Sequence, residues 1–201
     1  MADSFSCALV LLAAGASTRM GRPKQLLPVG DRPLLCQVAG AALAAPVSPV
    51  IVVLGAHAAE IAPSLGGLGV HLVVNDGWSE GMGSSIRAGM ETLLSLAPAI
   101  DGVVIVLADQ ADFSASHVAR LLDVRRQTGR SMIASQFRGA LMPPALFAAE
   151  HFPCLCALQG DAGARSLLQA RADEVGTVPL AAVADLDTPS DYTAYLGRNS
   201  R

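Results

Sequence analysis

Short runs of apolar residues recur along the chain, and each run ends at small or polar residues. The runs at residues 7–12 and 50–55 are typical of strands whose two faces are both buried. The four strongest runs predict strands at residues 7–12, 50–55, 70–74 and 103–109, and weaker strands are expected at 131–135 and 175–179.

The segments between these runs have the apolar spacing and the end signals of helices. Pro46 and Pro49 close an alanine-rich helix over 34–45, and Ser114 or Ser116 can cap a helix that extends to about residue 127. Further helices are expected over 57–64 and 84–96, and after residues 160 and 188, whereas the stretch 137–156, with three prolines, is expected to be the least regular.

Alternating strands and helices with short connections predict an α/β fold with a parallel or mostly parallel sheet that helices cover on both faces. Residues 1–201 are expected to form a single domain, because the sequence shows no repeat, linker or break in composition. Ligands of such sheets bind beyond the carboxyl ends of the strands. Polar, glycine-rich segments follow strands at residues 15–24, 75–85 and 109–114, so these segments are the candidate ligand site.

Composition and charge exclude several classes of protein. The 201 residues are 52% hydrophobic and 15% charged, which is typical of a compact folded chain, and the net charge of −3 argues against a nucleic-acid or membrane surface. Residues 1–6 lack the basic segment of a signal peptide, so a cytoplasmic location is expected. Cys154 and Cys156 form a CxC pair, but no CxxC or zinc spacing is present, and we expect packing rather than a redox or metal role.

The segment LLAAGASTRMGRPKQLLPV at residues 11–29 places positive charge directly after the first predicted strand. Lys24 is the only lysine in the chain, and Arg19 and Arg22 lie close to it in sequence. Small residues at positions 15–18 leave backbone N–H groups accessible to a phosphate, and a lysine adds a compact point charge. The residues alone leave two interpretations open, a phosphate-binding loop and a solvated basic loop.

The full stretch LAAGASTRMGRPKQLLPVGDRPLL resembles the signature LAAGxSxRMGxxKxLLPxxGxPL of the MobA-like NTP transferases, with one residue fewer between the proline and the glycine. The resemblance implies a three-layer α/β/α sandwich with the Rossmann-like nucleotidyltransferase fold. It implies that Lys24 and Arg19 are catalytic and act on the phosphates. It also implies nucleotide binding by Leu12, Ala13, Ala14, Gly15, Ala16, Ser17, Thr18, Arg19 and Lys24.

Two aspartates are candidate metal ligands. Asp109 follows a buried strand, and carboxylates with substrate phosphates are typical ligands of Mg²⁺, although this residue alone could equally cap a turn. The resemblance implies that Asp109 and Asp187 hold Mg²⁺, with Asp185 in an accessory place at most. The family's DQP is DQA here, so Ala111 departs from it. Thr188 and Asp191 form the pattern of a helix capping box.

The segment NDGWSEGMGSSIRAGM resembles the family segment that contacts the base and the ribose. This implies that Asn75, Gly81, Gly83, Ser84, Ser85 and Asp109 bind nucleotide, while the residues alone fit an ordinary serine-capped helix equally well. Members that transfer guanylyl groups tend to carry LAGG, whereas cytidylyl-transferring members carry LAAG, as this chain does at residues 12–15. The methyl group of Ala14 would disfavour a purine, so CTP is the expected nucleotide.

The acceptor side departs most from the family pattern. Met142 and Pro143 stand where glycine and histidine are usual, although Pro144 and the downstream LQGDAGARSLL fit. Arg165 could bind an acceptor phosphate or pair with Asp161 four residues earlier on a helix. The acceptor is expected to contact Gln110, Pro144, Asp161 and Arg165.

These features predict a Mg²⁺-dependent enzyme that transfers CMP from CTP to a phosphorylated acceptor, a molybdopterin-type cofactor, and releases pyrophosphate. Two alternatives keep the fold, namely a sugar- or polyol-phosphate nucleotidyltransferase and a GTP-using guanylyltransferase. An alternative of another class is a non-catalytic chaperone that carries a cofactor to a molybdoenzyme. The sequence leaves open whether a molybdoenzyme apoprotein docks on the chain.

Overall fold

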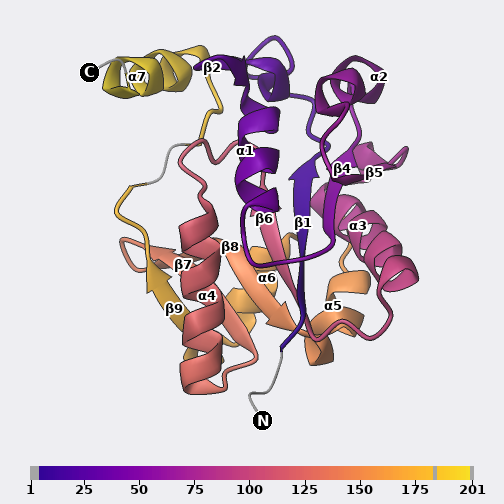
Figure 1. The fold of residues 1–201 in the computed structure, drawn as a ribbon, viewed down its shortest axis with the longest axis vertical. Coiled ribbons are helices and arrows are strands. Elements are labelled where there is room, and N and C mark those ends of the chain that lie inside the picture. The colour runs from indigo at the N-terminus through magenta and orange to yellow at the C-terminus, as the bar shows by residue number, and fades with distance from the viewer. Residues whose placement is uncertain (1–4, 183–184, 200–201) are drawn as a thin grey trace.

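The computed structural model describes residues 5–182 and 185–199, and a seven-stranded sheet runs through its centre (Figure 1). Every residue of the first strand is buried, as its apolar run predicts. In sheet order the strands are β5 (His71–Val74), β4 (Val50–Leu54), β1 (Cys7–Ala13), β6 (Gly102–Leu107), β8 (Ala140–Ala148), β7 (Met132–Phe137) and β9 (Gly176–Pro179).

The sheet is mostly parallel, as expected. Strand β1 lies between β4 and β6 and is parallel to both, and β5 extends this parallel half. Strand β8 is antiparallel to both of its neighbours, while β9 is again parallel to β7. The carboxyl ends of β1, β4 and β6 therefore meet at one edge of the sheet, where the loops after them can form a common site.

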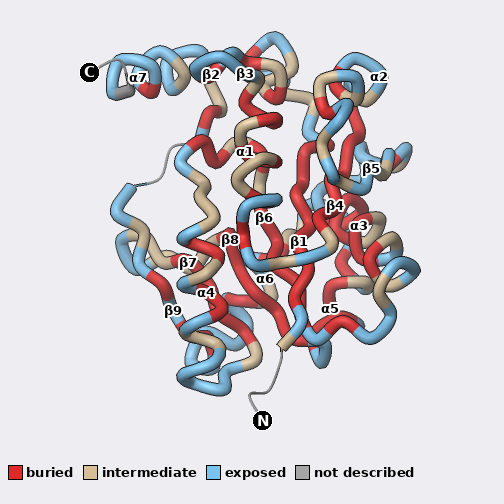
Figure 2. The backbone as a smooth tube through the Cα atoms, viewed as in Figure 1, coloured by how far each residue is buried: buried red, intermediate tan, exposed pale blue. Residues whose placement is uncertain are grey.

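Helices cover both faces of the sheet, which gives three layers (Figure 1). One face packs against α1 (Leu34–Leu43) and α4 (Ala115–Thr128), and the other packs against α3 (Met82–Leu96), α5 (Phe152–Cys156) and α6 (Ala164–Ala170). Two separate apolar cores result, and the buried backbone in Figure 2 follows the strands and the inner sides of these helices. The architecture is the expected three-layer α/β/α sandwich.

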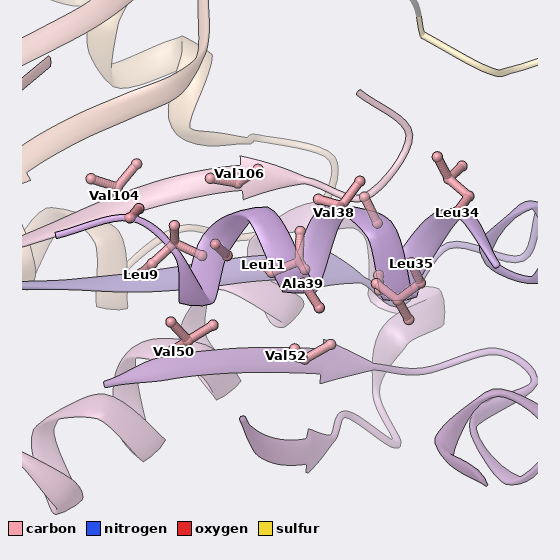
Figure 3. Close-up of a cluster of buried hydrophobic side chains, with 14 of the residues drawn as sticks. Leu9, Leu11, Leu34, Leu35, Val38, Ala39, Val50, Val52, Val104 and Val106 are labelled. Atoms are coloured by element: carbon pink, nitrogen blue, oxygen red, sulfur yellow. The ribbon is translucent and has the colours of Figure 1, made fainter. Parts of the chain in front are cut away.

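Alternation along β1 divides its side chains between the two cores. Leu9 and Leu11 pack on the side of α1, where Figure 3 shows them with Val38 of that helix and Val106 of β6. Val10 belongs to the core on the other face. Because successive side chains of a strand point to opposite faces, a run that is apolar at every position is needed to fill both cores.

The expectation that residues 137–156 are irregular is wrong. This stretch forms β8, a strand of nine residues, and then a short 3₁₀ turn and α5. The pairing with β7 shifts register between Ala134 and Ser135, whose partners are Ala145 and Met142. The shift leaves Pro143 and Pro144 out of the regular pairs, and prolines have no N–H to donate. The irregularity is therefore confined to two residues within a continuous strand.

Smaller elements complete the chain. A two-stranded hairpin joins β2 (Pro28–Val29) to β3 (Arg32–Pro33), and α2 (Ala58–Ile61) leads to the exposed edge strand β5. The last helix is α7 (Pro189–Asn199). No helix in the described residues is long and apolar enough to cross a membrane. Single 3₁₀ turns lie at Lys24–Leu26, Ala62–Leu65, Trp78–Glu80, Ala149–His151 and Ala172–Glu174.

Candidate active site

A cleft of about 570 Å³ opens at the carboxyl ends of β1 and β6. Its floor combines the loop after β1, the start of α3 and the acidic residues that follow β6 and precede α7. The lining residues are Leu12, Ala13, Ala14, Gly15, Ala16, Arg19, Lys24, Gln25, Trp78, Ser79, Gly81, Met82, Ser85, Leu107, Ala108, Asp109, Asp161, Asp185 and Asp187.

The loop after β1 is held in shape by Gln25, a residue that the sequence analysis did not single out. Gln25 is 1% exposed, and its Nε2 donates to the carbonyls of Ala13 at 2.8 Å and Gly15 at 3.0 Å. Ser17, at φ +56°, donates its hydroxyl to Gln25 Oε1 and accepts the backbone N–H of Lys24. The buried amide thus fixes both the loop and the place from which Lys24 extends.

Lys24 joins the two aspartates that the sequence analysis selected as metal ligands. Its Nζ lies 2.6 Å from Asp109 Oδ2 and 2.9 Å from Asp187 Oδ1. Arg19 Nη2 lies 2.8 Å from Asp187 Oδ2, although the arginine side chain is 69% exposed. Lys24 and Asp109 are both largely buried, so this ion pair is screened less than a surface pair. The two basic and two acidic candidates therefore form one cluster.

Backbone contacts bring Asp187 to Asp109 from a distant part of the chain. Gln110 and Asp185 form an isolated antiparallel bridge, and the N–H of Leu186 donates to the carbonyl of Asp109 at 3.1 Å. Immediately afterwards, Thr188 and Asp191 exchange hydrogen bonds in the expected capping box and start α7. The bridge on one side and the cap on the other hold Asp187 in place.

Burial and neighbouring charges shift the pKa values of this cluster. Burial alone would lower the pKa of Lys24, but Asp109 and Asp187 outweigh it and raise that pKa above its ordinary value. Burial raises the pKa of Asp187, but Lys24 and Arg19 outweigh it and lower that pKa below its ordinary value. Burial, with the charges of Asp109 and Asp187, raises the pKa of Asp185 to about 6. Lys24 is therefore charged at neutral pH.

The residues present fit a divalent cation. Asp109 Oδ1 is buried and has no hydrogen-bond partner within residues 5–182 and 185–199, so one carboxylate oxygen is free to accept a ligand. The cation Lys24 already lies between Asp109 and Asp187, which shows that the two carboxylates face a common centre of positive charge. Within the described part of the chain, no group of three or more His, Cys, Asp or Glu side chains is arranged to hold a metal.

Three of the residues that were predicted to bind nucleotide before and at the start of α3 support the backbone there and do not line the cleft. Asn75 Nδ2 donates to the hydroxyls of Ser84 and Ser85, and Ser84 Oγ donates to the carbonyl of Gly81 at 2.8 Å. A Cβ on Gly83 would lie 2.9 Å from the backbone nitrogen of Gln159, so this glycine is required for close packing. Of the predicted nucleotide ligands, Ser17, Thr18, Asn75, Gly83 and Ser84 are not among the residues that line the cleft.

A second cavity, of about 230 Å³, adjoins the cleft and shares Leu12, Met82, Leu107 and Asp185 with it. Two of the predicted acceptor residues, Gln110 and Arg165, line this cavity. Of the other two, Asp161 lines the cleft, and Pro144 lines a third cavity, on the side of α4 and β9. The remaining lining residues of the second cavity are Ile105, Met142, Pro143, Gly163 and Ala164.

Arg165 and Asp161 do not lie on one helix. Helix α6 begins at Ala164, so Asp161 precedes it and the proposed pairing four residues apart on a helix does not arise. Asp161 and Arg165 line different cavities, the cleft and its neighbour. The structure thus separates two residues that were both predicted to contact the acceptor.

Several cleft residues were not among the predicted contacts. Gln25, Trp78, Ser79, Met82, Leu107 and Ala108 all line the cleft. Trp78 and Met82 are exposed, at 37% and 41%, and border the cleft. The only sequence signal for these two was their place beside the glycines of the loop before α3. Gln25 had no signal, because its contacts form only when the loop folds back on β1.

The fold and the site together define a nucleotidyltransferase. A profile of the MobA-like NTP transferase domain matches residues 9–175. The chain belongs to this family.

Two curated relatives are similar to most of the chain. The purine catabolism protein PucB of Bacillus subtilis strain 168 is 33% identical over 195 residues, which is 91% of this chain and 92% of that protein. The nicotine blue oxidoreductase of Paenarthrobacter nicotinovorans is 36% identical over 170 residues, 80% of each chain.

Solved structures agree with the fold. Rv0371c of Mycobacterium tuberculosis H37Rv, crystallised in complex with manganese, superimposes with a TM-score of 0.80 at 27% identity and covers 96% of this chain and 98% of its own. A nucleotidyl transferase from Methanothermobacter thermautotroptrophicus has a TM-score of 0.79 at 21% identity over 96% of this chain and 97% of its own, and supports the fold alone.

Proposed function

We propose that this nucleotidyltransferase transfers CMP from CTP to a phosphorylated acceptor, a molybdopterin-type cofactor, and releases pyrophosphate in a Mg²⁺-dependent reaction. The observation that carries the proposal is the cluster in which Lys24 Nζ lies within 2.9 Å of both Asp109 and Asp187 on the floor of a nucleotide-sized cleft. Such a cluster contains the charges that phosphoryl transfer needs, namely a cation for the phosphates and a pair of carboxylates for a metal.

The basic residues bind and orient the triphosphate. The backbone of residues 15–16 and the guanidinium of Arg19 line the cleft where the phosphates would lie. When nucleotide binds, we expect Lys24 to turn from the carboxylates to the phosphate oxygens. Asp109 and Asp187 would then be free to hold Mg²⁺. The bound Mg²⁺ would neutralise negative charge on the phosphates.

The transfer itself needs no general base from the chain. An acceptor phosphate oxygen, already ionised at neutral pH, attacks the α-phosphorus; the new P–O bond forms as the bond to the bridging oxygen breaks, and pyrophosphate leaves with that electron pair. Lys24 stabilises the charge that develops on the leaving pyrophosphate. Catalysis by the chain is therefore positioning together with electrostatic stabilisation.

The choice of CTP rests on Ala14. This residue lines the cleft, is 6% exposed, and its Cβ lies 2.8 Å from the position that a Cβ on Gly55 would occupy. The wall of the cleft at this point is therefore closely packed, and the methyl group of Ala14 takes room that a purine would need. The alternative with the same fold is a guanylyltransferase that uses GTP.

A pyrophosphate-release assay tests the proposal. Protein and Mg²⁺ are combined with each of the four NTPs in turn, and with molybdopterin, glucose 1-phosphate or erythritol 4-phosphate as acceptor. We expect release with CTP and molybdopterin, and its loss in Lys24→Met. Pyrophosphate release with a different pair would replace the proposed substrates. If no pair gave release and the protein still bound an NTP, a cofactor-binding chaperone would be favoured over an enzyme.

Gln37→Met is the matched control for the assay. Gln37 lies on α1, and its Nε2 donates to the carbonyl of Ala111 at 3.4 Å, outside the residues that line the cleft or the second cavity. The substitution removes one long hydrogen bond to the loop that also contains Asp109. We expect this variant to release pyrophosphate at the wild-type rate.

A further inference from the structure

The cavity beside the cleft has walls that are mostly apolar. Its sides are formed by Ile105 and Leu107 of β6, Met142 and Pro143 of β8, and Ala164 at the start of α6. Three side chains bring polar groups to it, Gln110, Arg165 and Asp185. An occupant of this cavity therefore meets hydrophobic surface on most sides and few hydrogen-bonding partners.

Gln110 presents an acceptor that no group of the described chain satisfies. The residue is 8% exposed, and its Nε2 donates to the carbonyl of Pro143 at 2.8 Å. A carbonyl can only accept a hydrogen bond, so this contact fixes the amide with its NH₂ group toward Pro143. The carbonyl oxygen Oε1 is left buried and without a partner among residues 5–182 and 185–199.

An unpartnered buried acceptor favours a ligand with a hydrogen-bond donor. Burying a polar atom without a partner is unfavourable. A ligand donor that reaches Oε1 therefore contributes more binding free energy than the same hydrogen bond would at an exposed site. Arg165 of the same cavity supplies positive charge for an acceptor phosphate. Arg165 and Gln110 thus match a phosphate and a donor edge on one molecule, and Asp185 adds a second acceptor for the donor edge.

A polyol phosphate does not match this surface. Each hydroxyl group of a polyol both donates and accepts, and each would lose its water partners against Leu107, Ile105 or Met142. A flat ring has two apolar faces that fit such walls, and an N–H on its edge needs a single acceptor. The cavity therefore favours a ring with one edge donor over a chain of hydroxyls.

We propose that Gln110 is a specificity-determining residue for the acceptor: its Oε1 accepts a hydrogen bond from a ring N–H and so selects a phosphorylated N–H heterocycle over a polyol phosphate. This inference rests on the proposed function, because it assigns the second cavity to the acceptor. Met142 and Pro143, where the chain departs from the family pattern, then form the apolar wall and the anchor of the Gln110 amide.

Gln110 also borders the third cavity, of about 260 Å³, which Asp112, His117 and Arg120 line as well. A ligand in that cavity would meet the amide from the side of α4. If Gln110 bound only such a ligand, a change at Gln110 would leave the KM for the acceptor unaltered. The kinetic test below therefore separates the two cavities.

The test compares ring binding and acceptor kinetics in the full-length protein. Fluorescence titration measures the binding of pterin and of N3-methylpterin, which lacks the ring N–H, in the presence of Mg²⁺ and CTP. Steady-state assays measure KM for molybdopterin and for CTP. The variants are Gln110→Met, which removes both polar atoms at similar length, Gln110→Glu, which retains an acceptor oxygen, and Gln37→Met as the matched control.

We expect the wild type to bind pterin at least about tenfold more tightly than N3-methylpterin, because a site built around one hydrogen bond rejects a ligand that lacks it. In Gln110→Met this preference should fall to near unity and KM for molybdopterin should rise about tenfold, with KM for CTP unchanged. Gln110→Glu keeps an acceptor oxygen but cannot donate to Pro143, so it should keep only part of the preference. Gln37→Met should behave as the wild type.

Equal binding of the two pterins by the wild type would overturn the inference. So would a preference that survives in Gln110→Met, or an unaltered KM for molybdopterin in that variant. Absence of pyrophosphate release with every acceptor would count against the proposed function instead, and the pterin titration would still measure the Gln110 contact. The two failures are therefore distinguishable.

Discussion

Lys24 and Asp109 are 85 residues apart in the sequence, yet Nζ of the lysine lies 2.6 Å from Oδ2 of the aspartate. The same ammonium group lies 2.9 Å from Asp187 Oδ1. One ammonium group thus bonds to both carboxylates that we propose as metal ligands. A divalent cation that binds as we propose would compete with Lys24 for these oxygens.

Replacing Lys24 with methionine separates the two roles of the lysine. We expect Lys24→Met to lose transfer activity by at least about a hundredfold. Removing one group that stabilises the charge developing in the transition state typically lowers kcat by that factor. The variant should also bind Mn²⁺ more tightly than the wild type in the absence of nucleotide, since the competing ammonium is gone. Pyrophosphate release and calorimetric Mn²⁺ titration measure the two effects, with thermal unfolding as the check on folding. Unchanged turnover would contradict the proposed mechanism.

Gln25→Met tests whether the buried amide positions the loop after β1. The change removes hydrogen bonds to the carbonyls of Ala13 and Gly15. We expect the free energy of unfolding to fall by about 1–3 kcal/mol, because buried carbonyls are left without partners. KM for the nucleotide should rise more than KM for the acceptor. Urea unfolding and steady-state kinetics measure these effects, and an unaltered KM for the nucleotide would count against a positioning role.

Ala14→Gly tests the basis of nucleotide choice. Loss of the methyl group enlarges the cleft beside Gly55 and Trp78, so kcat/KM for GTP should rise relative to CTP by about tenfold, the typical effect of one methyl group in a pocket. Ala16→Gly makes the same change in the same loop and controls for added flexibility. The proposal for Ala14 fails if both variants shift the ratio equally or neither does.

His117 makes the stability of the protein depend on pH. Its Nε2 lies 2.7 Å from Ser135 Oγ, whose own hydrogen is donated to the carbonyl of Pro144, so the histidine donates to the serine. Burial and the charge of Arg120 lower the pKa of His117 to about 4. The stability that comes from the neutral ring is therefore complete above about pH 6.5, the pKa of histidine in the unfolded chain. This stability is lost as the pH falls toward 4.

His117→Gln removes this titration. Between pH 7.5 and pH 5, we expect the wild type to lose about 2 kcal/mol more unfolding free energy than the variant, because at pH 5 the unfolded chain binds a proton that the folded chain does not. Urea unfolding of both proteins at the two pH values measures the difference, and other titrating groups cancel in the comparison. Parallel losses in the two proteins would show that His117 does not titrate in this way.

Local patterns predicted most of the sheet and its helices. Strands such as β1 and β4 were predictable because both of their faces are buried, so every position must be apolar. Strand β8 was missed because Pro143 and Pro144 are typical of irregular backbone. The register shift opposite them depends on β7, and no local signal in β8 reports the pairing with that strand.

The site was predictable only in part. From the residues alone, the loop after β1 and its single lysine fitted either a phosphate-binding loop or a solvated basic loop. The role of the loop and the pairing of Asp109 with Asp187 both depended on family resemblance. The contacts of Gln25 and the free oxygen of Gln110 could not be predicted, because each depends on which carbonyl a distant segment brings near the amide. Long-range backbone geometry, rather than residue type, decides these roles.

The bridge between Gln110 and Asp185 also determines when the site is completed during synthesis of the chain. All seven strands and the loop that carries Lys24 precede residue 180 in the sequence. Asp187 emerges from the ribosome after them and reaches Asp109 only once Leu186 has docked on the loop after β6. A nascent chain therefore has the segments for the core on the α3 side, and for most of the core on the α1 side, before it has both carboxylates; Leu186 and Tyr195 complete the second core. The charged cluster thus forms only after most of the scaffold around it exists.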